Sequence, residues 1–210
     1  MTLVKICGIT NLTDAQHAVD SGADQLGFNF YERSPRYISS QDARNIVDEI
    51  PISCGNVGVF VNKDIEQVLE IAKFVGLDGI QLHGDEDELY VKDLMKRTDK
   101  FIIKAFRVSS RVVLDNAIES RTPYILLDGH APNEQGGTGT KFDWDVAGDI
   151  TFLRPESVYL AGGLTPENVA EAIRKVRPYA VDVASGVESS KGKKDPDKVV
   201  AFIKAAKEAL

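Results

Sequence analysis

Eight short apolar segments recur along this chain, and a segment with helical periodicity follows each one. The apolar segments cover residues 3–6, 25–28, 56–61, 79–82, 101–105, 124–127, 157–161 and 180–183. In the segment after the third, the apolar residues that share one helical face are Ile65, Val68, Leu69, Ala72 and Val75. Strands that are apolar throughout and alternate with helices are typical of a parallel sheet covered by helices.

Eight strand–helix units can close into a (β/α)8 barrel or lie open as a doubly wound sheet. The open sheet usually has fewer strands, and its dinucleotide-binding form needs Gly-x-Gly-x-x-Gly after the first strand. That place holds Cys7-Gly8-Ile9-Thr10, and the 210 residues suit a barrel with short loops. Since no linker or change of composition divides the chain, we expect residues 1–210 to form a single-domain (β/α)8 TIM barrel of the α/β class.

Chemically versatile residues gather at the carboxyl ends of the predicted strands, where barrels of this kind carry their functional sites. The opposite ends carry mostly turn residues, such as Gly76, Pro123 and Pro178. The candidate site residues at the carboxyl ends are Cys7, Arg36, His83, Asp128, Gly162, Gly163, Asp182, Ser185 and Gly186. This asymmetry predicts that the functional site lies on one rim of the barrel.

Cys7 directly follows the first apolar segment and precedes Gly8 and a helix start at Asn11. A free cysteine is often only a small buried hydrophobic residue, so its position is equally compatible with packing and with chemistry. A reactive thiolate needs a lowered pKa, which nearby cationic groups can provide. Lys5 shares the strand face of Cys7 and is expected one layer deeper in the barrel. The other cysteine, Cys54, falls at the opposite rim.

Asp128 follows the apolar segment 124–127, and a long loop separates it from the next helix. It could be a simple turn residue, but no helix start is close enough for it to cap. A partly desolvated carboxyl group has a raised pKa, which suits a general acid. The glycine-rich loop 130–141 that follows is long for this chain, and we expect it to cover the substrate.

Two glycine loops, at Gly162-Gly163 and Ser185-Gly186, follow the seventh and eighth strands, and residues 184–188 suit a short extra helix. In this fold such loops, together with a short extra helix, bind phosphate through backbone N–H groups. Pro35 stiffens the loop that carries Arg36, whose guanidinium can bind a carboxylate with two hydrogen bonds. For His83, a structural hydrogen bond and a contact to the substrate are equally compatible with the sequence.

The composition restricts the partners of the protein. A formal charge of −7 argues against a nucleic-acid partner, and two cysteines in the whole chain suggest a reducing compartment. No apolar run approaches the roughly 18 residues that a membrane span needs, and no signal segment is apparent. We therefore expect a cytoplasmic protein, a monomer or homodimer, that binds a small phosphorylated substrate and neither membrane nor nucleic acid. Neither metal-site spacing nor a cofactor fingerprint is present, so we expect no cofactor and no metal.

Nine motifs, in order along essentially the whole chain, resemble the phosphoribosylanthranilate isomerase family of tryptophan biosynthesis. Each is weak alone, but their order and their positions on the loops make the resemblance specific. They are Lys5-Ile6-Cys7-Gly8-Ile9-Thr10, Gly27-Phe28 with Ser34-Pro35-Arg36, Val57-Gly58-Val59-Phe60-Val61-Asn62, Gln81-Leu82-His83-Gly84, Leu127-Asp128, Gly136-Gly137-Thr138-Gly139 before Phe142-Asp143-Trp144, Ala161-Gly162-Gly163-Leu164, Pro166-Glu167-Asn168 and Ser185-Gly186-Val187-Glu188. Ala184 departs from the family, which often has serine there.

The resemblance implies an Amadori rearrangement of N-(5-phosphoribosyl)anthranilate, with Asp128 as general acid and Cys7 as general base. It also implies that Arg36 binds the anthranilate carboxylate and that the two glycine loops bind the phosphate; Asp182 could bind a sugar hydroxyl. Indole-glycerol-phosphate synthase and ribulose-phosphate epimerase are rival barrels, but the first is expected to use lysine and glutamate and the second metal ligands. A binding barrel without activity is disfavoured, because both proton-transfer residues are present.

Overall fold

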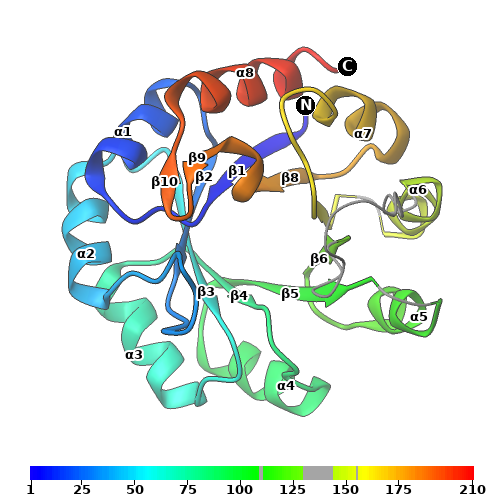
Figure 1. Ribbon diagram of the computed structural model, residues 1–210. Coiled ribbons are helices and arrows are strands. Elements are labelled where there is room, and N and C mark those ends of the chain that lie inside the picture. Colours follow the sequence, from blue (N-terminus) through cyan, green and yellow to red (C-terminus); the bar gives the residue numbers. More distant parts are fainter. Residues whose placement is uncertain (109–110, 130–143, 155) are drawn as a thin grey trace.

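Eight parallel strands close into a barrel in the order β1 to β8 (Figure 1). The structure, a computed structural model, describes residues 1–108, 111–129, 144–154 and 156–210. The barrel strands are β1 (Leu3–Cys7), β2 (Gln25–Asn29), β3 (Gly55–Phe60), β4 (Gly79–Leu82), β5 (Phe101–Arg107), β6 (Tyr124–Asp128), β7 (Val158–Ala161) and β8 (Ala180–Val183). The predicted barrel is confirmed, with strand ends that differ by one or two residues. Cys7 and Asp128 are the last residues of their strands.

Helices surround the barrel on its outside (Figure 1). They are α1 (Leu12–Asp20), α2 (Ser40–Glu49), α3 (Ile65–Val75), α4 (Glu88–Arg97), α5 (Arg111–Glu119), α6 (Trp144–Leu153), α7 (Val169–Val176) and α8 (Pro196–Lys207). The predicted start of α1 is confirmed, because the Asn11 side chain accepts a hydrogen bond from the Asp14 N–H. The predicted covering loop 130–141 lies outside the described residues.

The barrel has two apolar layers, one on each side of its strands. The large outer layer packs the strands against the helices and includes Ile6, Phe28, Leu82 and Leu160. A smaller inner cluster fills the barrel and contains Val57, Ile103, Ala105, Leu126, Tyr159, Ala161 and Ala180. Since successive side chains of a strand point to opposite faces, every second residue of each strand faces the interior. This alternation brings Lys5 and Cys7 to the interior together.

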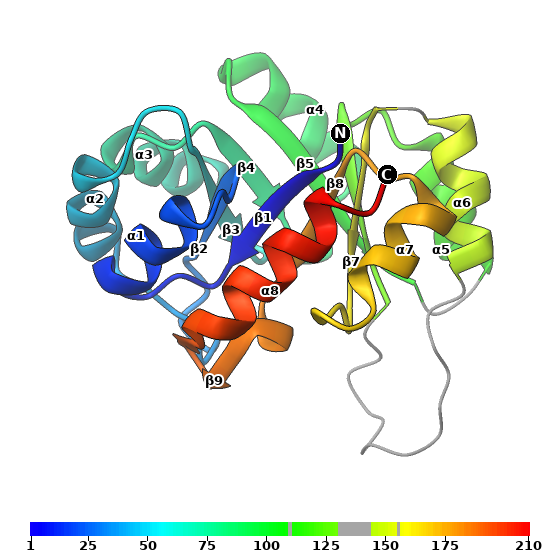
Figure 2. The ribbon, with the colours of Figure 1, turned by 90° about the horizontal axis from the view of Figure 1, so that it is seen from above.

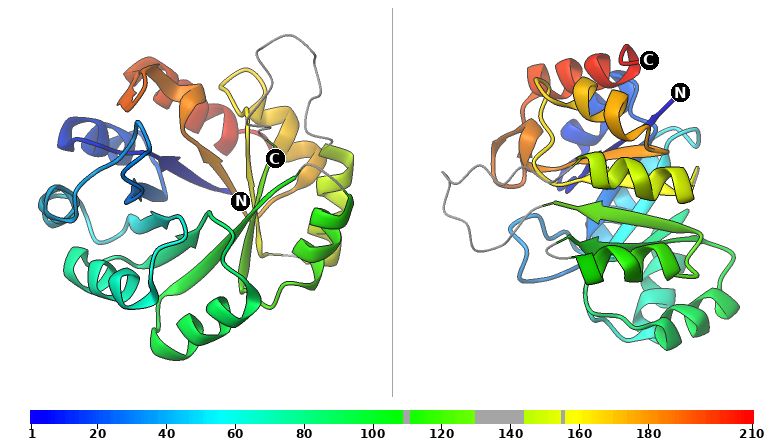
Figure 3. Two further views of the ribbon diagram at one scale, coloured as in Figure 1. Left: turned by 60° about the horizontal axis from the view of Figure 1, so that its bottom comes forward. Right: turned by 90° about the vertical axis from the view of Figure 1, so that its right-hand side faces the viewer.

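A short 3₁₀ helix, η1 (Ser185–Val187), and a small antiparallel hairpin separate β8 from α8. The hairpin pairs β9 (Glu188–Ser190) with β10 (Lys193–Lys194). The short helix after β8 was predicted, whereas the hairpin was not. Figure 2 shows the hairpin projecting beyond the barrel at the end where β1 finishes. In Figure 3 both chain termini lie towards the other end of the barrel.

Among the described residues, no helix is both long enough and apolar enough to cross a membrane.

Candidate active site

A pocket of about 530 Å³ opens at the carboxyl ends of the barrel strands. All nine candidate site residues from the sequence line this one pocket. They come from the ends of strands β1, β6 and β8 and from the loops after β2, β4, β7 and β8. The structure therefore brings the predicted residues together, while their individual roles remain predictions.

Cys7 is the last residue of β1, and its side chain lies at the floor of the pocket with only 9 % of its surface exposed. Glycine at position 27 makes room for the thiol, because a Cβ there would lie 2.7 Å from the Cys7 Sγ. Burial, followed by the nearby Asp182 carboxylate, raises the pKa of the thiol. Lys5 and Lys194 act in the opposite direction but do not outweigh these causes. The free protein therefore holds Cys7 mainly as a neutral thiol at neutral pH.

Lys5 lies one layer below Cys7, as its strand position predicts, and is fully buried. Its ammonium donates to the Asp182 Oδ1 at 2.6 Å and to the Gln81 Oε1 at 3.0 Å. Burial alone would lower the pKa of Lys5, but Asp182 and Cys7 outweigh it, so the pKa is raised. Lys5 is therefore a fixed positive charge beneath the thiol.

The contact to Lys5 also determines which nitrogen of His83 carries the proton. Because Lys5 can only donate, the oxygen of Gln81 faces it and the Gln81 Nε2 faces the His83 Nδ1 at 2.9 Å. The Gln81 amide donates there, so the His83 Nδ1 is an acceptor and the Nε2 carries the hydrogen. The Nε2 then donates to the Asp128 Oδ2 at 3.2 Å.

This chain of hydrogen bonds suits an acid at Asp128. A donor directed at the carboxyl group stabilises the carboxylate that forms when the acid gives up its proton. The contact gives His83 a structural hydrogen bond, one of the two possibilities the sequence left open. A contact of His83 to the substrate remains a prediction.

Gly162 packs directly against the end of β6. Its φ of 84° lies in the left-handed region, and a Cβ there would lie 2.8 Å from the Asp128 Oδ1. Glycine is therefore required at this position both by its backbone conformation and by the closeness of Asp128. The first of the two predicted phosphate loops is thus in contact with the proposed acid.

The two predicted phosphate loops also touch each other. A Cβ on Gly186 would clash with the carbonyl oxygen of Leu164, which follows Gly163 in the loop after β7. The two loops form adjacent parts of the pocket wall. Such a pair of glycine loops with a short helix suits a phosphate group.

Arg36 reaches the pocket from the loop after β2 and is already engaged by a carboxylate of the protein. Its Nε and Nη2 donate to the two oxygens of Glu188, each at 2.7 Å. Gly8 makes room for this side chain, because a Cβ there would lie 2.5 Å from the Arg36 Cδ. The ion pair raises the pKa of Arg36. Glu188 thus fixes the guanidinium and leaves its outer N–H groups for a ligand.

Three residues that hold the candidate site residues in place were not predicted from the sequence: Gln81, Glu188 and Lys194. Gln81 had a signal, since it is a polar residue in an apolar strand, two positions before His83. No sequence signal points to Lys194, because it lies in a lysine-rich segment of the kind that is usually exposed to solvent. Yet it is 2 % exposed, and its ammonium donates to the Cys7 carbonyl at 2.6 Å.

Cys54 lies away from this pocket, just before β3, and is buried. Burial raises the pKa of its thiol to about 11, and its Sγ lies 3.6 Å from the Ala23 carbonyl oxygen. Both cysteines are free thiols. Within residues 1–108, 111–129, 144–154 and 156–210, no group of three or more His, Cys, Asp or Glu side chains could hold a metal ion.

Comparisons with known proteins show the family to which this chain belongs. The family model of N-(5'-phosphoribosyl)anthranilate (PRA) isomerase matches residues 4–205. An N-(5'-phosphoribosyl)anthranilate isomerase from Trichlorobacter lovleyi is 50% identical over 210 residues, which cover 100% of both chains. The crystal structure of the isomerase from Thermotoga maritima has a TM-score of 0.91 and 47% identity, with 99% of each chain covered.

A further isomerase structure contains reduced 1-(o-carboxyphenylamino)-1-deoxyribulose 5-phosphate. It has a TM-score of 0.88 and 45% identity, with 99% of each chain covered.

The fold and the pocket define a (β/α)8-barrel protein whose ligand site lies at the carboxyl ends of its strands, beside two glycine loops. Within this class the match over nearly the whole chain is decisive. The chain belongs to the N-(5'-phosphoribosyl)anthranilate isomerase family.

Proposed function

We propose that this protein is the isomerase of tryptophan biosynthesis that converts N-(5-phosphoribosyl)anthranilate to 1-(2-carboxyphenylamino)-1-deoxyribulose 5-phosphate, with Asp128 as general acid and Cys7 as general base. The family and its named members support the reaction. The observation that supports the residue roles is the shared pocket, in which a carboxyl group and a thiol meet beside two glycine loops.

The rearrangement begins with the opening of the ribose ring. Asp128 gives a proton to the ring oxygen, the C1–O bond breaks, and the nitrogen lone pair forms an iminium ion with C1. The His83 Nε2–H, 3.2 Å from the Asp128 Oδ2, stabilises the carboxylate that results. The sugar is then an open chain with a positive charge at the iminium group.

The second step moves a proton within the open chain. The Cys7 thiolate takes the proton from C2. The electron pair of the broken C–H bond forms a C1–C2 double bond, and the π electrons of the iminium return to nitrogen, which gives a neutral enolamine. The enolamine becomes the ketone when C1 gains a proton and the C2 hydroxyl loses one. The positive iminium beside Cys7 favours the thiolate, so substrate binding and ring opening offset the raised pKa of the free thiol.

Two groups of residues hold the substrate between Cys7 and Asp128. The loops at Gly162-Gly163 and Ser185-Gly186 bind the phosphate through backbone N–H groups. Arg36, fixed by Glu188, binds the anthranilate carboxylate through its remaining N–H groups. In this proposal Asp182 binds a sugar hydroxyl while its Oδ1 accepts a hydrogen bond from Lys5.

The deciding experiment is a fluorescence assay of freshly prepared phosphoribosylanthranilate with the purified protein, with and without a chelator. We expect turnover in both. The absence of turnover would exclude the proposed function, and loss of turnover with the chelator would exclude the metal-free mechanism.

The same assay tests the two proton-transfer residues. We expect Cys7→Ala and Asp128→Asn each to lower kcat by about 10²–10⁴-fold, because each removes one proton-transfer group. Affinity for a phosphate-bearing product analogue should survive in both variants. Cys54→Ala is the matched control and should retain full turnover. Near-normal kcat in either site variant would exclude that residue from its role.

Location and assembly are proposals of the same kind. A cytoplasmic site fits the two free thiols, and cell fractionation tests it. A relative from Thermotoga maritima is described as dimeric. We propose a monomer or homodimer here, which sedimentation of the purified protein distinguishes.

A further inference from the structure

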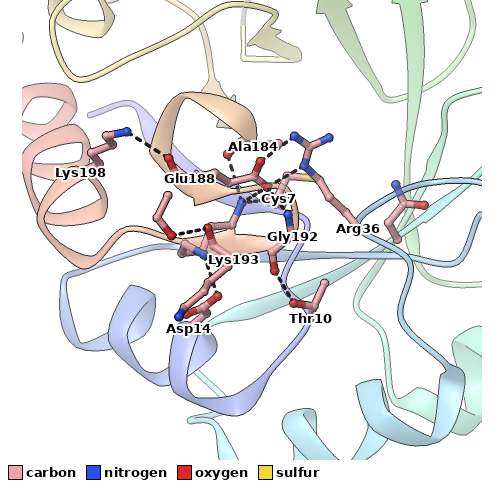
Figure 4. Close-up of polar contacts among 12 residues, drawn as sticks. Cys7, Thr10, Asp14, Arg36, Ala184, Glu188, Gly192, Lys193 and Lys198 are labelled. Carbon is pink, nitrogen blue, oxygen red and sulfur yellow. Dashed lines mark hydrogen bonds and ion pairs between the residues drawn. The ribbon is translucent and has the colours of Figure 1, made fainter.

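Lys194 is a buried lysine of β10 that the mechanism above does not use. It is 2 % exposed, and its ammonium lies among three acceptors: the Cys7 carbonyl at 2.6 Å, the Ala184 carbonyl at 3.1 Å and the Glu188 Oε1 at 3.4 Å. Figure 4 labels the three residues that supply these acceptors, Cys7, Ala184 and Glu188, which lie close to Arg36. Three acceptors satisfy the three N–H donors of an ammonium group.

Each acceptor belongs to a different part of the proposed site. Cys7 is the proposed base at the end of β1. Ala184 precedes the Ser185-Gly186 phosphate loop. Glu188 holds Arg36, the proposed carboxylate anchor, by two hydrogen bonds of 2.7 Å. A single ammonium therefore connects the base, the phosphate loop and the carboxylate anchor.

The hairpin that carries Lys194 is itself fixed to the rim. The Lys194 N–H donates to the Asp14 Oδ2 at 2.8 Å, and the Thr10 hydroxyl donates to the Gly192 carbonyl at 2.6 Å. A Cβ on Gly192 would lie 2.9 Å from the Pro35 carbonyl oxygen, so the hairpin also packs against the loop that carries Arg36. The hairpin thus links the loops after β1 and β2 to the end of β8.

We propose that Lys194 is a positioning residue of the isomerase reaction, whose buried ammonium holds Cys7 beside the phosphate loop and keeps Glu188 on Arg36. This inference rests on the proposed function. Lys194 acts through Cys7 and Glu188 and does not itself touch the substrate.

The positive charge of Lys194 also acts on the thiol. Cys7 faces Lys5 from its own strand, Asp182 from β8, Arg36 from the loop after β2 and Lys194 from the hairpin. Burial and Asp182 raise the pKa of Cys7, whereas Lys5 and Lys194 lower it. Burial lowers the pKa of Lys194 itself, and Glu188 opposes that shift. Removing the ammonium should therefore raise the pKa of Cys7 further.

A merely structural lysine would affect stability but leave the protonation of the thiol unchanged. The chain has two cysteines, so Cys54→Ala leaves Cys7 as the single thiol. The rate of its alkylation by iodoacetamide at different pH values then reports its pKa without any need for turnover.

The experiment compares Lys194→Met, Lys194→Arg and the matched control Lys193→Met in the Cys54→Ala background. Lys193 is the exposed neighbour in the same strand and carries the same charge. We expect K194M to move the alkylation midpoint to higher pH and to lower both alkylation and kcat/KM at neutral pH by about tenfold. K194R should restore the midpoint towards that of the parent, and K193M should match the parent.

Glu188→Gln tests the contacts of Glu188 with Lys194 and Arg36. It also provides an independent test if K194M does not fold. Loss of the ion pair should raise KM for the substrate about tenfold with a smaller change in kcat, because Arg36 is no longer fixed. An unchanged alkylation midpoint in folded K194M, an equal shift in K193M, or an unchanged KM in E188Q would overturn the proposal. Absence of turnover in the parent would instead overturn the proposed function, since the alkylation profile does not depend on it.

Discussion

At the scale of single residues, the site combines a raised thiol pKa with a fixed positive charge beneath it. Burial and Asp182 keep Cys7 protonated in the free protein, while Lys5 and Lys194 limit that shift. In its proposed role as base, Cys7 is neutral at rest and becomes charged beside the cationic intermediate, so it acts only when the substrate is in place. This arrangement protects the thiol from reaction with other electrophiles.

The raised pKa of Cys7 predicts a rising pH profile. In the Asp128→Asn variant, where no acid titrates at position 128, the residual kcat/KM reports the free enzyme and should increase with pH from about 6 to 9 as the Cys7 thiolate forms. The profile of kcat should rise at lower pH, since the iminium ion favours the thiolate. Steady-state kinetics over this range, corrected for spontaneous substrate decay, measures both. A flat kcat/KM profile would contradict Cys7 as the base.

Arg36→Ala should weaken the binding of substrates that carry the anthranilate carboxylate. We expect KM to rise by about 10–100-fold, because a bidentate charge-assisted contact is lost. An analogue without the carboxylate should be affected far less. Arg33→Ala, in the exposed part of the same loop, is the control and should change neither value. Equal losses for both substrates would argue against a carboxylate contact.

At the scale of elements, short loops determine the geometry of the site. Strands β1 and β6 end in Cys7 and Asp128, and glycines allow neighbouring side chains and loops to approach these strand ends closely. Gly8 accommodates Arg36, Gly27 accommodates Cys7, and Gly162 lies against Asp128. The hairpin β9–β10 then covers the ends of β1 and β8. Small residues thus set the distances between the side chains that line the pocket.

Gly162→Ala should displace Asp128. The added Cβ would meet the carboxylate and the backbone of Gly129, so kcat should fall by about 10²-fold. The left-handed φ adds a loss in stability of about 1–2 kcal/mol. Gly163→Ala shares the left-handed φ but has nothing within 4 Å of its Cβ, so it separates the two effects. Equal kcat values for the two variants, from the same assay and thermal melts, would count against the contact with Asp128.

At the scale of the whole molecule, closure of the barrel creates the site. The pairing of β1 with β8 sets Lys5 opposite Asp182, which are 177 residues apart in the chain. The resulting ion pair has side chains that are 0% and 9% exposed. A single domain over residues 1–210 remains a prediction. The closed barrel nevertheless requires both β1 and β8, the first and the last of its strands.

Lys5→Met should therefore weaken the whole barrel. It leaves the Asp182 carboxylate buried without its partner, which costs about 3–5 kcal/mol. Lys5→Met combined with Asp182→Leu should recover much of this loss, because it removes both charges. Urea unfolding of the three proteins measures the effect. A double variant no more stable than K5M would show that the unpaired charge is not the cause.

The sequence alone determined the fold and nine of the residues that line the pocket. Eight apolar segments separated by amphipathic helices indicate a parallel barrel, and in such a barrel the carboxyl ends of the strands share one rim. Cys7, Asp128 and the two glycine loops could be placed there because their positions depend only on local periodicity.

Only the tertiary structure decided how these residues are held. The contacts of Lys5 with Gln81, of Arg36 with Glu188 and of Lys194 with Cys7 join positions 76, 152 and 187 residues apart. Local patterns carry no information on such contacts, because they depend on which strands and loops meet once the barrel closes. The raised pKa of Cys7 has the same origin, since burial and the charge of Asp182 exist only in the folded protein.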